Sequence, residues 1–343
     1  MRIYPDTLTC ILKKSELNVN QISKITGISN TYITKLVRSK VNHPGKDKIA
    51  SLLLALNYSI TDINAILAEY DYMPLNEFDI PSILENNRRR KFEGRIMPHF
   101  DHIYFELVMA ALEGIGGTKI VLKHRPSGIF IPIPLYLKKE FPIEEDHEAA
   151  RFFMAFTKEI VLERKKLFLE NCKKGAKYET YICRHCMEES LAKNIGSSAM
   201  KSSPEKVELF AQYFANAVSV TLKYPEQHYH QVVRRCGYFE FMMQDAEGEN
   251  CKISFTGRRH HFYHKEWEQL SLQSFLSDAP GILSVFHSEV DRCREAVEIK
   301  SSPSAMAQGF HDAVREQFDK HQVVDLFDRA LESLMKDSGL IFF

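Results

Sequence analysis

The segment TGISNTYITKLVRSK, residues 26–40, most constrains the fold that this chain can adopt. When residues 30–38 are projected as a helix at about 100° per residue, polar and apolar side chains fall on separate arcs. The apolar arc consists of Tyr32, Ile33, Leu36 and Val37. Gly27 allows a sharp turn before this helix, and Ser29 is a favourable N-cap residue. The segment therefore predicts a short helix that packs one face on a neighbour and leaves a polar face exposed.

The flanking sequence predicts that this helix belongs to a small helical bundle. Apolar residues recur at helical spacing in five stretches between residues 6 and 70, and none of these stretches indicates a strand. The apolar arc can pack against Ile22 and Ile25 of the preceding stretch, where the small Ser23 allows the helices to approach closely. Residues 6–70 are therefore expected to form five helices with tight connections.

Charge is unevenly distributed in the N-terminal part, although the whole chain has 45 Lys or Arg and 45 Asp or Glu. Residues 1–48 contain nine Lys or Arg against three Asp or Glu. Residues 49–87 contain six acidic residues and neither Lys nor Arg. A positive patch confined to the first 48 residues is suited to binding phosphates.

The polar arc of residues 30–38 has the composition of a surface that contacts nucleic acid. It carries Asn30, Thr31, Thr34, Lys35 and Arg38. Side chains of these types hydrogen-bond base edges in the major groove or bind phosphates. The alternative is a bundle that binds a partner protein, as in an antitoxin or a phage-defence component. Spacing, local charge and the number of helices together favour DNA binding.

These features resemble the helix-turn-helix domain of lambda-repressor-like, Xre-type transcriptional regulators over roughly residues 6–70. The resemblance rests on Ile22, Ser23, Gly27, Ile28, Ser29, Ile33 and Leu36. Two positions depart from the family pattern, because Ser23 stands where the family usually carries Ala and no acidic residue follows Ile33.

The resemblance implies that the recognition helix lies within residues 29–40 and that the partner is double-stranded DNA. The DNA-binding residues that it implies are Gln21, Ser29, Asn30, Thr31, Thr34, Lys35, Arg38, Lys40, Lys46 and Lys48. Asn30, Thr31, Thr34 and Lys35 are the candidates for base contacts, and the cations from Arg38 onward are candidates for phosphate contacts. Because one such domain reads few base pairs, a homodimer on a pseudo-palindromic site is expected.

The remainder of the chain predicts a different architecture. Residues 1–75 are expected to form the DNA-binding domain, residues 76–98 a linker, and residues 99–343 a mixed α/β domain with a helical C-terminal tail. Strands are expected at 118–124, 128–135 and 177–183, with a further strand and a hairpin within 230–257. Helices are expected at 145–176, at 203–224 and over most of the last 75 residues. The fold class is therefore a five-helix bundle followed by a larger α/β domain, which by analogy would dimerise and sense a small ligand.

Two segments of the larger domain carry residues that are candidates for binding a metal ion or a small ligand. In CRHCMEE, residues 183–189, Cys183, His185 and Cys186 form one C-x-x-C motif with an internal histidine, which is half a zinc site at best. Distant histidines, including His228 and His230, could complete it, and a metal- or thiol-responsive regulator is the corresponding alternative.

The second segment is FTGRRHHFYHKEWEQ, residues 255–269. Its cationic and titratable side chains are Arg258, Arg259, His260, His261 and His264. Interleaved with aromatic residues, they are suited to an anionic or aromatic small ligand. A solvated surface loop is the alternative interpretation.

Several function classes find no support in the sequence. EGIGGTK, residues 113–119, lacks the lysine spacing of a P-loop, and no hydrolase motif occurs, so the chain is expected to be neither an enzyme nor a cofactor-binding protein. No apolar stretch reaches the roughly 20 residues that cross a bilayer, and the N-terminus does not resemble a secretory signal. Seven scattered cysteines indicate a reducing compartment, and a cytoplasmic location is expected.

Overall fold

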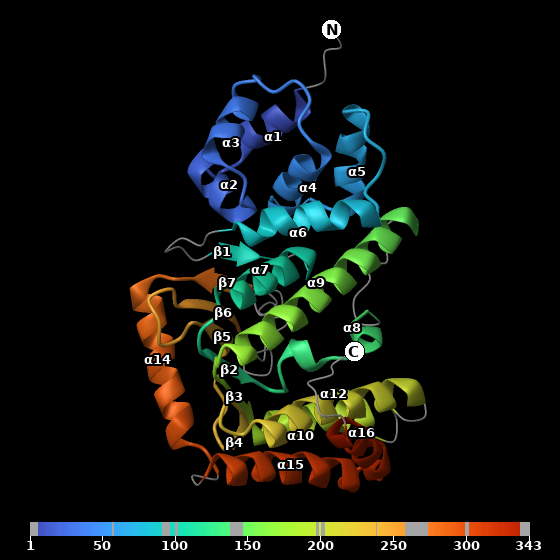
Figure 1. Cartoon of the computed structure of the whole chain (residues 1–343), viewed down its shortest axis with the longest axis vertical. Coiled ribbons are helices and arrows are strands. Elements are labelled where there is room, and N and C mark those ends of the chain that lie inside the picture. Colours follow the sequence, from blue (N-terminus) through green and yellow to red (C-terminus); the bar gives the residue numbers. More distant parts are fainter. Residues whose placement is uncertain are drawn as a thin grey trace, which may run out of the picture. The chain divides into compact units, whose positions relative to one another are not determined.

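The structure of the chain is a computed structural model (Figure 1). It divides into two compact units. It describes residues 6–56, 58–90, 97–99, 102–137, 147–196, 199, 203–237, 239–257, 274–298 and 302–336. Unit 1 comprises Met1–Gly94, His99–Gly114 and Phe141–Arg164. Unit 2 comprises Arg95–Pro98, Ile115–Glu140 and Lys165–Phe343. The fold class is α + β, with a helical N-terminal region and a mixed sheet covered by helices, as the sequence predicted.

Unit 1 begins with the five helices that the apolar spacing predicted. They are α1 (Thr7–Lys14), α2 (Val19–Thr26), α3 (Asn30–Val37), α4 (Lys46–Ala55) and α5 (Ile60–Glu69). Polar side chains fix where three of them begin: Asn18 caps α2 in a capping box with Gln21, Ser29 caps α3, and Ser59 caps α5. These caps satisfy backbone N–H groups that the first turn of a helix leaves without partners.

The expected linker at residues 76–98 is wrong in its first half, because this part of the chain is helical. A 3-10 turn, η1 (Glu77–Asp79), leads into helix α6 (Ile80–Arg88). Ile80, Ile83 and Leu84 are buried in the same hydrophobic cluster as the core residues of α1 to α5. The Nδ2 atom of Asn86 donates to Asp47 Oδ2 at 3.0 Å and to Ser51 Oγ at 3.2 Å, which ties α6 to α4.

Unit 1 also extends beyond residue 75, where the sequence placed its boundary. Helix α7 (His102–Ile115) contributes Leu107 and Ala110 to the same cluster, and the first part of α9 (His147–Lys173) contributes Phe152 and Phe156. Asn87 Nδ2 donates to the Leu107 carbonyl at 2.9 Å. Within unit 1 the buried ion pair between Arg164 Nη1 and Glu106 Oε2, at 2.5 Å, joins α9 to α7. The helices that complete this core are distant in sequence from the bundle that they cover.

Unit 2 is built on a sheet whose described strands run in the order β1-β7-β6-β5-β2-β3-β4. Their bounds are β1 (Met97–His99), β2 (Lys119–Lys123), β3 (Tyr178–Cys183), β4 (His228–Val233), β5 (Phe239–Gln244), β6 (Lys252–Gly257) and β7 (Ser274–Ser277). Strand β3 pairs in parallel with both β2 and β4, whereas β5 is antiparallel to β2 and β6. Every residue of β3 is buried, as expected for a parallel strand with both faces covered.

Two helical layers cover this sheet, and consecutive residues of its strands show which layer meets which face. Tyr181 and Val233 belong to the cluster containing helix α14 (Pro280–Glu295). Their neighbours Ile182 and Val232 belong to the cluster formed by the other helices, as the alternation of side chains along a strand requires. Those helices include α10 (Arg184–Ile195), α12 (Pro204–Lys223), α15 (Pro303–Lys320) and α16 (Val324–Lys336). The carboxyl ends of β3 and β4 therefore lie between the two helical layers.

The strand predicted at 128–135 is wrong. The chain forms a 3-10 turn, η2 (Gly128–Phe130), and a short helix, α8 (Ile133–Leu137). Ile129, Phe130, Ile131 and Leu135 are buried, so the apolar side chains of this segment do pack in the core. Pro132 and Pro134 lack the backbone N–H that a sheet ladder requires, which excludes this segment from a central strand.

Among the described residues, no helix combines the length and the apolar composition that crossing a membrane would need.

Candidate functional site

The turn between α2 and α3 has the geometry that the sequence predicted. Gly27 ends α2 with a left-handed backbone, φ 72°, and its N–H bonds to the Ser23 carbonyl. A Cβ atom at this position would lie 2.0 Å from the carbonyl oxygen of Asn86 on α6. Glycine is therefore required twice, once for the turn and once for the close approach of α6. Only the first requirement was visible in the sequence.

Helix α3 is held by a buried apolar face and by two polar contacts. Ile33 and Leu36 are 0% and 2% exposed within the core of unit 1. The Thr9 hydroxyl of α1 donates to the Leu36 carbonyl at 3.0 Å, and the Tyr32 N–H donates to the Ser29 hydroxyl at the start of the helix. These contacts fix the rotation of α3 about its axis and thereby determine which side chains face outward.

The outward face of α3 is polar and cationic, and it is called here the α3 surface. Its exposed members are Ser29, Asn30, Thr31, Lys35, Arg38 and Lys40, with Thr34 half-buried among them. Asn30 Nδ2 donates to the side-chain oxygen of the exposed Asn20 at 3.2 Å, so α2 also contributes to this surface. Asn20 was missed because helical projection of α3 alone says nothing about which residue of α2 lies beside it.

Three of the predicted DNA-binding residues are engaged within unit 1 instead. Gln21 is 8% exposed, and its Oε1 accepts from the Asn18 N–H in the capping box. Lys46 Nζ lies 2.6 Å from Asp79 Oδ2 and donates to the Pro74 carbonyl at 2.8 Å. These bonds give the two side chains structural roles at α2 and η1.

Lys48, the third of these residues, bonds to the end of α6 and to its own neighbour. Its Nζ atom donates to Asn86 Oδ1 and lies 3.2 Å from Asp47 Oδ2. The structure therefore leaves Lys35, Arg38 and Lys40 as the exposed cations of the predicted set.

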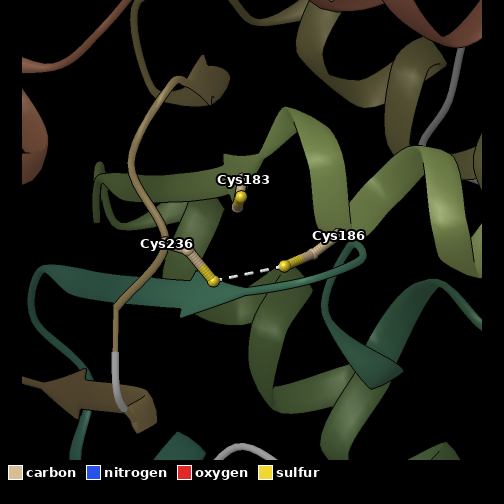
Figure 2. A group of neighbouring side chains, drawn as sticks. All are labelled: Cys183, Cys186 and Cys236. Atoms are coloured by element: carbon tan, nitrogen blue, oxygen red, sulfur yellow. Dashed lines mark hydrogen bonds between the residues drawn. The ribbon is translucent and has the colours of Figure 1, made fainter. Parts of the chain in front are cut away.

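The C-x-x-C motif of unit 2 belongs to a group of three cysteines, which is called the thiol cluster (Figure 2). Cys183 ends β3, Cys186 lies in the first turn of α10, and Cys236 follows β4. Their Sγ atoms all lie within 4.8 Å of one another, and those of Cys186 and Cys236 are 3.3 Å apart. Cys236 was missed because it is 50 residues away from Cys186 along the chain, and local sequence does not show which distant residue lies beside the motif.

His185, the histidine inside the motif, lies outside this cluster. Its side chain is exposed and lines an open cavity of about 550 Å³. The other lining residues are Cys183, Arg184, Glu188, Arg234, Glu298 and Glu316. The cavity lies where β3 and β4 end, the edge at which parallel sheets usually bind ligands. Cys183 links the thiol cluster to this cavity.

The histidines of β4 do not complete a metal site with the C-x-x-C motif. His228 instead lies against Cys172 of α9, with 3.0 Å between Nε2 and Sγ, and stacks on Tyr178. Burial and the nearby Lys119 lower the pKa of His228 to about 3, and burial beside His228 lowers the pKa of His230 to about 3. Both imidazoles are therefore neutral at ordinary pH and pack within the core.

The predicted ligand-binding residues Arg258, Arg259, His260, His261 and His264 lie outside the described residues.

No family model, curated protein or solved structure matches the chain.

Proposed function

We propose that the chain is a sequence-specific DNA-binding transcriptional regulator, with the α3 surface as its recognition element. The observation that carries the proposal is the fixed orientation of α3. Its apolar face is buried in the core, while Asn30, Thr31, Lys35 and Arg38 are exposed together on a short helix after a glycine turn. An exposed amide, hydroxyl and two cations are suited to base edges and phosphates of a major groove.

The proposal includes homodimerisation and control by a small ligand. One recognition helix covers only a few base pairs, so specific binding is expected to use two copies on a pseudo-palindromic site. The open cavity at the carboxyl ends of β3 and β4 is the best candidate for an effector site, since it contains both arginine and carboxylate side chains. A ligand that favours one dimer geometry would change the spacing of the two α3 helices and so the affinity for DNA.

Replacing Lys35 and Arg38 together by alanine is expected to weaken duplex binding at least about tenfold, because two charge contacts are lost. The slope of log affinity against log salt is expected to fall by roughly 0.9 for each phosphate contact removed. Fluorescence anisotropy with a labelled duplex at several salt concentrations measures both quantities.

The charge-matched control replaces Lys206 and Lys320, two exposed lysines of unit 2. It is expected to bind like the wild type. Equal losses in both double variants, or an unchanged affinity after the Lys35 and Arg38 replacements, would contradict the assignment of the α3 surface.

One observation favours a second candidate, a module that binds a partner protein. Met73 and Phe78 of unit 1 are 75% and 93% exposed, which is unusual for large apolar side chains close together in sequence. Replacing both by serine leaves DNA binding intact if the first proposal holds. If the protein binds no defined DNA and a co-purifying protein is lost from this variant, the second candidate is supported instead.

A further inference from the structure

The thiol cluster brings together three cysteines from separate segments of unit 2. Cys183 and Cys186 are 3% and 2% exposed, and Cys236 is intermediate. Buried cysteines commonly occur singly as small apolar residues. A convergence of three sulfur atoms within 4.8 Å is a different arrangement, because it places three potential ligand atoms around one point.

The scaffold around the cluster holds its members in place. In the parallel pairing of β3 and β4, Cys183 is in register with Val233. Val233 lies three residues before Cys236 along the chain. Arg184 binds Glu298 through two guanidinium nitrogens, at 2.7 and 2.9 Å, and the Glu298 N–H donates to the Val232 carbonyl. These bonds connect the first residue of α10 to the strand that leads to Cys236. The three thiols are therefore positioned by backbone pairing and by an ion pair.

The distances within the cluster fit one tetrahedral or trigonal metal ion. A metal–sulfur bond of about 2.3 Å places two sulfur ligands roughly 3.8–4.0 Å apart. The observed separations, 3.3 Å for one pair and at most 4.8 Å for all pairs, need only small side-chain shifts to reach this value.

We propose that Cys183, Cys186 and Cys236 bind one thiophilic d¹⁰ metal ion, Zn²⁺ or Cu⁺. Thiolate ligands select these soft or borderline ions over Mg²⁺ and Ca²⁺. Three sulfur ligands satisfy a trigonal Cu⁺ site, and for Zn²⁺ they leave one position for a fourth ligand from the adjoining cavity. The alternative, a disulfide between Cys186 and Cys236, would involve two of the three sulfur atoms and would leave Cys183 without a role.

The test uses the full chain, reduced and stripped of metal, and does not depend on DNA binding. Titration with Zn²⁺ against a chromogenic chelator, and with Cu⁺ under anaerobic conditions, is expected to show one tightly bound ion per chain. X-ray absorption of the loaded protein is expected to show three sulfur atoms at about 2.3 Å for Zn²⁺. A spectrum with only nitrogen and oxygen ligands, or no binding by the reduced protein, overturns the proposal.

Variants assign the ligands. Cys236→Ser is expected to weaken the preferred ion at least 100-fold, whereas Cys10→Ser, at an exposed cysteine of α1, leaves binding unchanged. Thermal unfolding of the metal-free protein shows whether Cys236→Ser folds. If this variant does not fold, the number of sulfur ligands that X-ray absorption finds in the wild type decides whether the proposal holds. Unchanged binding by folded Cys236→Ser contradicts the assignment, as does recovery of a Cys186–Cys236 disulfide in protein that binds no metal after reduction.

Discussion

Replacing Gly27 by alanine is expected to destabilise unit 1 by about 3 kcal/mol or more. Part of the cost is the left-handed backbone, which disfavours a side chain by roughly 1–2 kcal/mol. The larger part is the contact of the new Cβ with the Asn86 carbonyl, 2.0 Å away, since neither α6 nor the turn can move without disturbing the core. Urea unfolding gives the magnitude, and faster hydrogen exchange than in the wild type in peptides from α2, α3 and α6 shows that unit 1 is the part destabilised.

Gly175→Ala is the matched control for this prediction. Gly175 has a similar left-handed backbone, φ 83°, but nothing lies within 4 Å of the added Cβ. Its replacement is expected to cost only about 1–2 kcal/mol, from the backbone alone. If Gly27→Ala cost no more than Gly175→Ala, the packing of α6 against the turn would be contradicted.

Acidification is expected to produce the second large effect, through His228 and His230. The pKa of each is about 3 in the folded protein and about 6.5 in an unfolded chain. Below pH 6.5 the unfolded chain therefore takes up protons that the folded chain does not, and the free energy of unfolding falls as the pH falls. At pH 5 the loss is on the order of 2 kcal/mol for each histidine. Urea midpoints measured between pH 7.5 and pH 5 test this directly.

A variant and a control separate this effect from general acid denaturation. His230→Gln removes one of the two titrations and is expected to reduce the pH dependence by about half, whatever its effect at pH 7.5. Replacement of the exposed His185 by glutamine is expected to leave the pH dependence as in the wild type. A urea midpoint that does not change between pH 7.5 and pH 5 would show that the two imidazoles are not buried and neutral.

Local patterns were enough to predict the elements whose signals are short-range. The spacing of apolar residues and the cap at Ser29 predicted α1 to α5, and the strands expected at 118–124 and 177–183 correspond to β2 and β3. Helix α6 was missed because Pro81 lies between its apolar residues Ile80 and Ile83 and a basic run follows, which together suggested a linker. Its stability comes from packing against α4, a contact that local sequence does not reveal.

The candidate sites show the same difference between features that local sequence predicts and features that depend on distant contacts. Helical projection predicted the exposed residues of α3, since the buried Ile33 and Leu36 determine its orientation. It could not show that the ammonium groups of Lys46 and Lys48 bond to Asp79 and Asn86, because these partners are more than 30 residues away. Cys236 joins the C-x-x-C motif for a similar reason, through the pairing of β3 with β4.

Selection of bound fragments from a genomic library by the purified full chain is the most direct test of the central claim. The wild type is expected to recover fragments that share one pseudo-palindromic sequence, with half-sites about one helical turn apart, or a multiple of this distance. The variant with Lys35 and Arg38 replaced by alanine is expected to lose this enrichment, and the variant with Lys206 and Lys320 replaced is expected to keep it. Recovery of fragments with no shared sequence by the wild type would contradict the claim that α3 reads DNA.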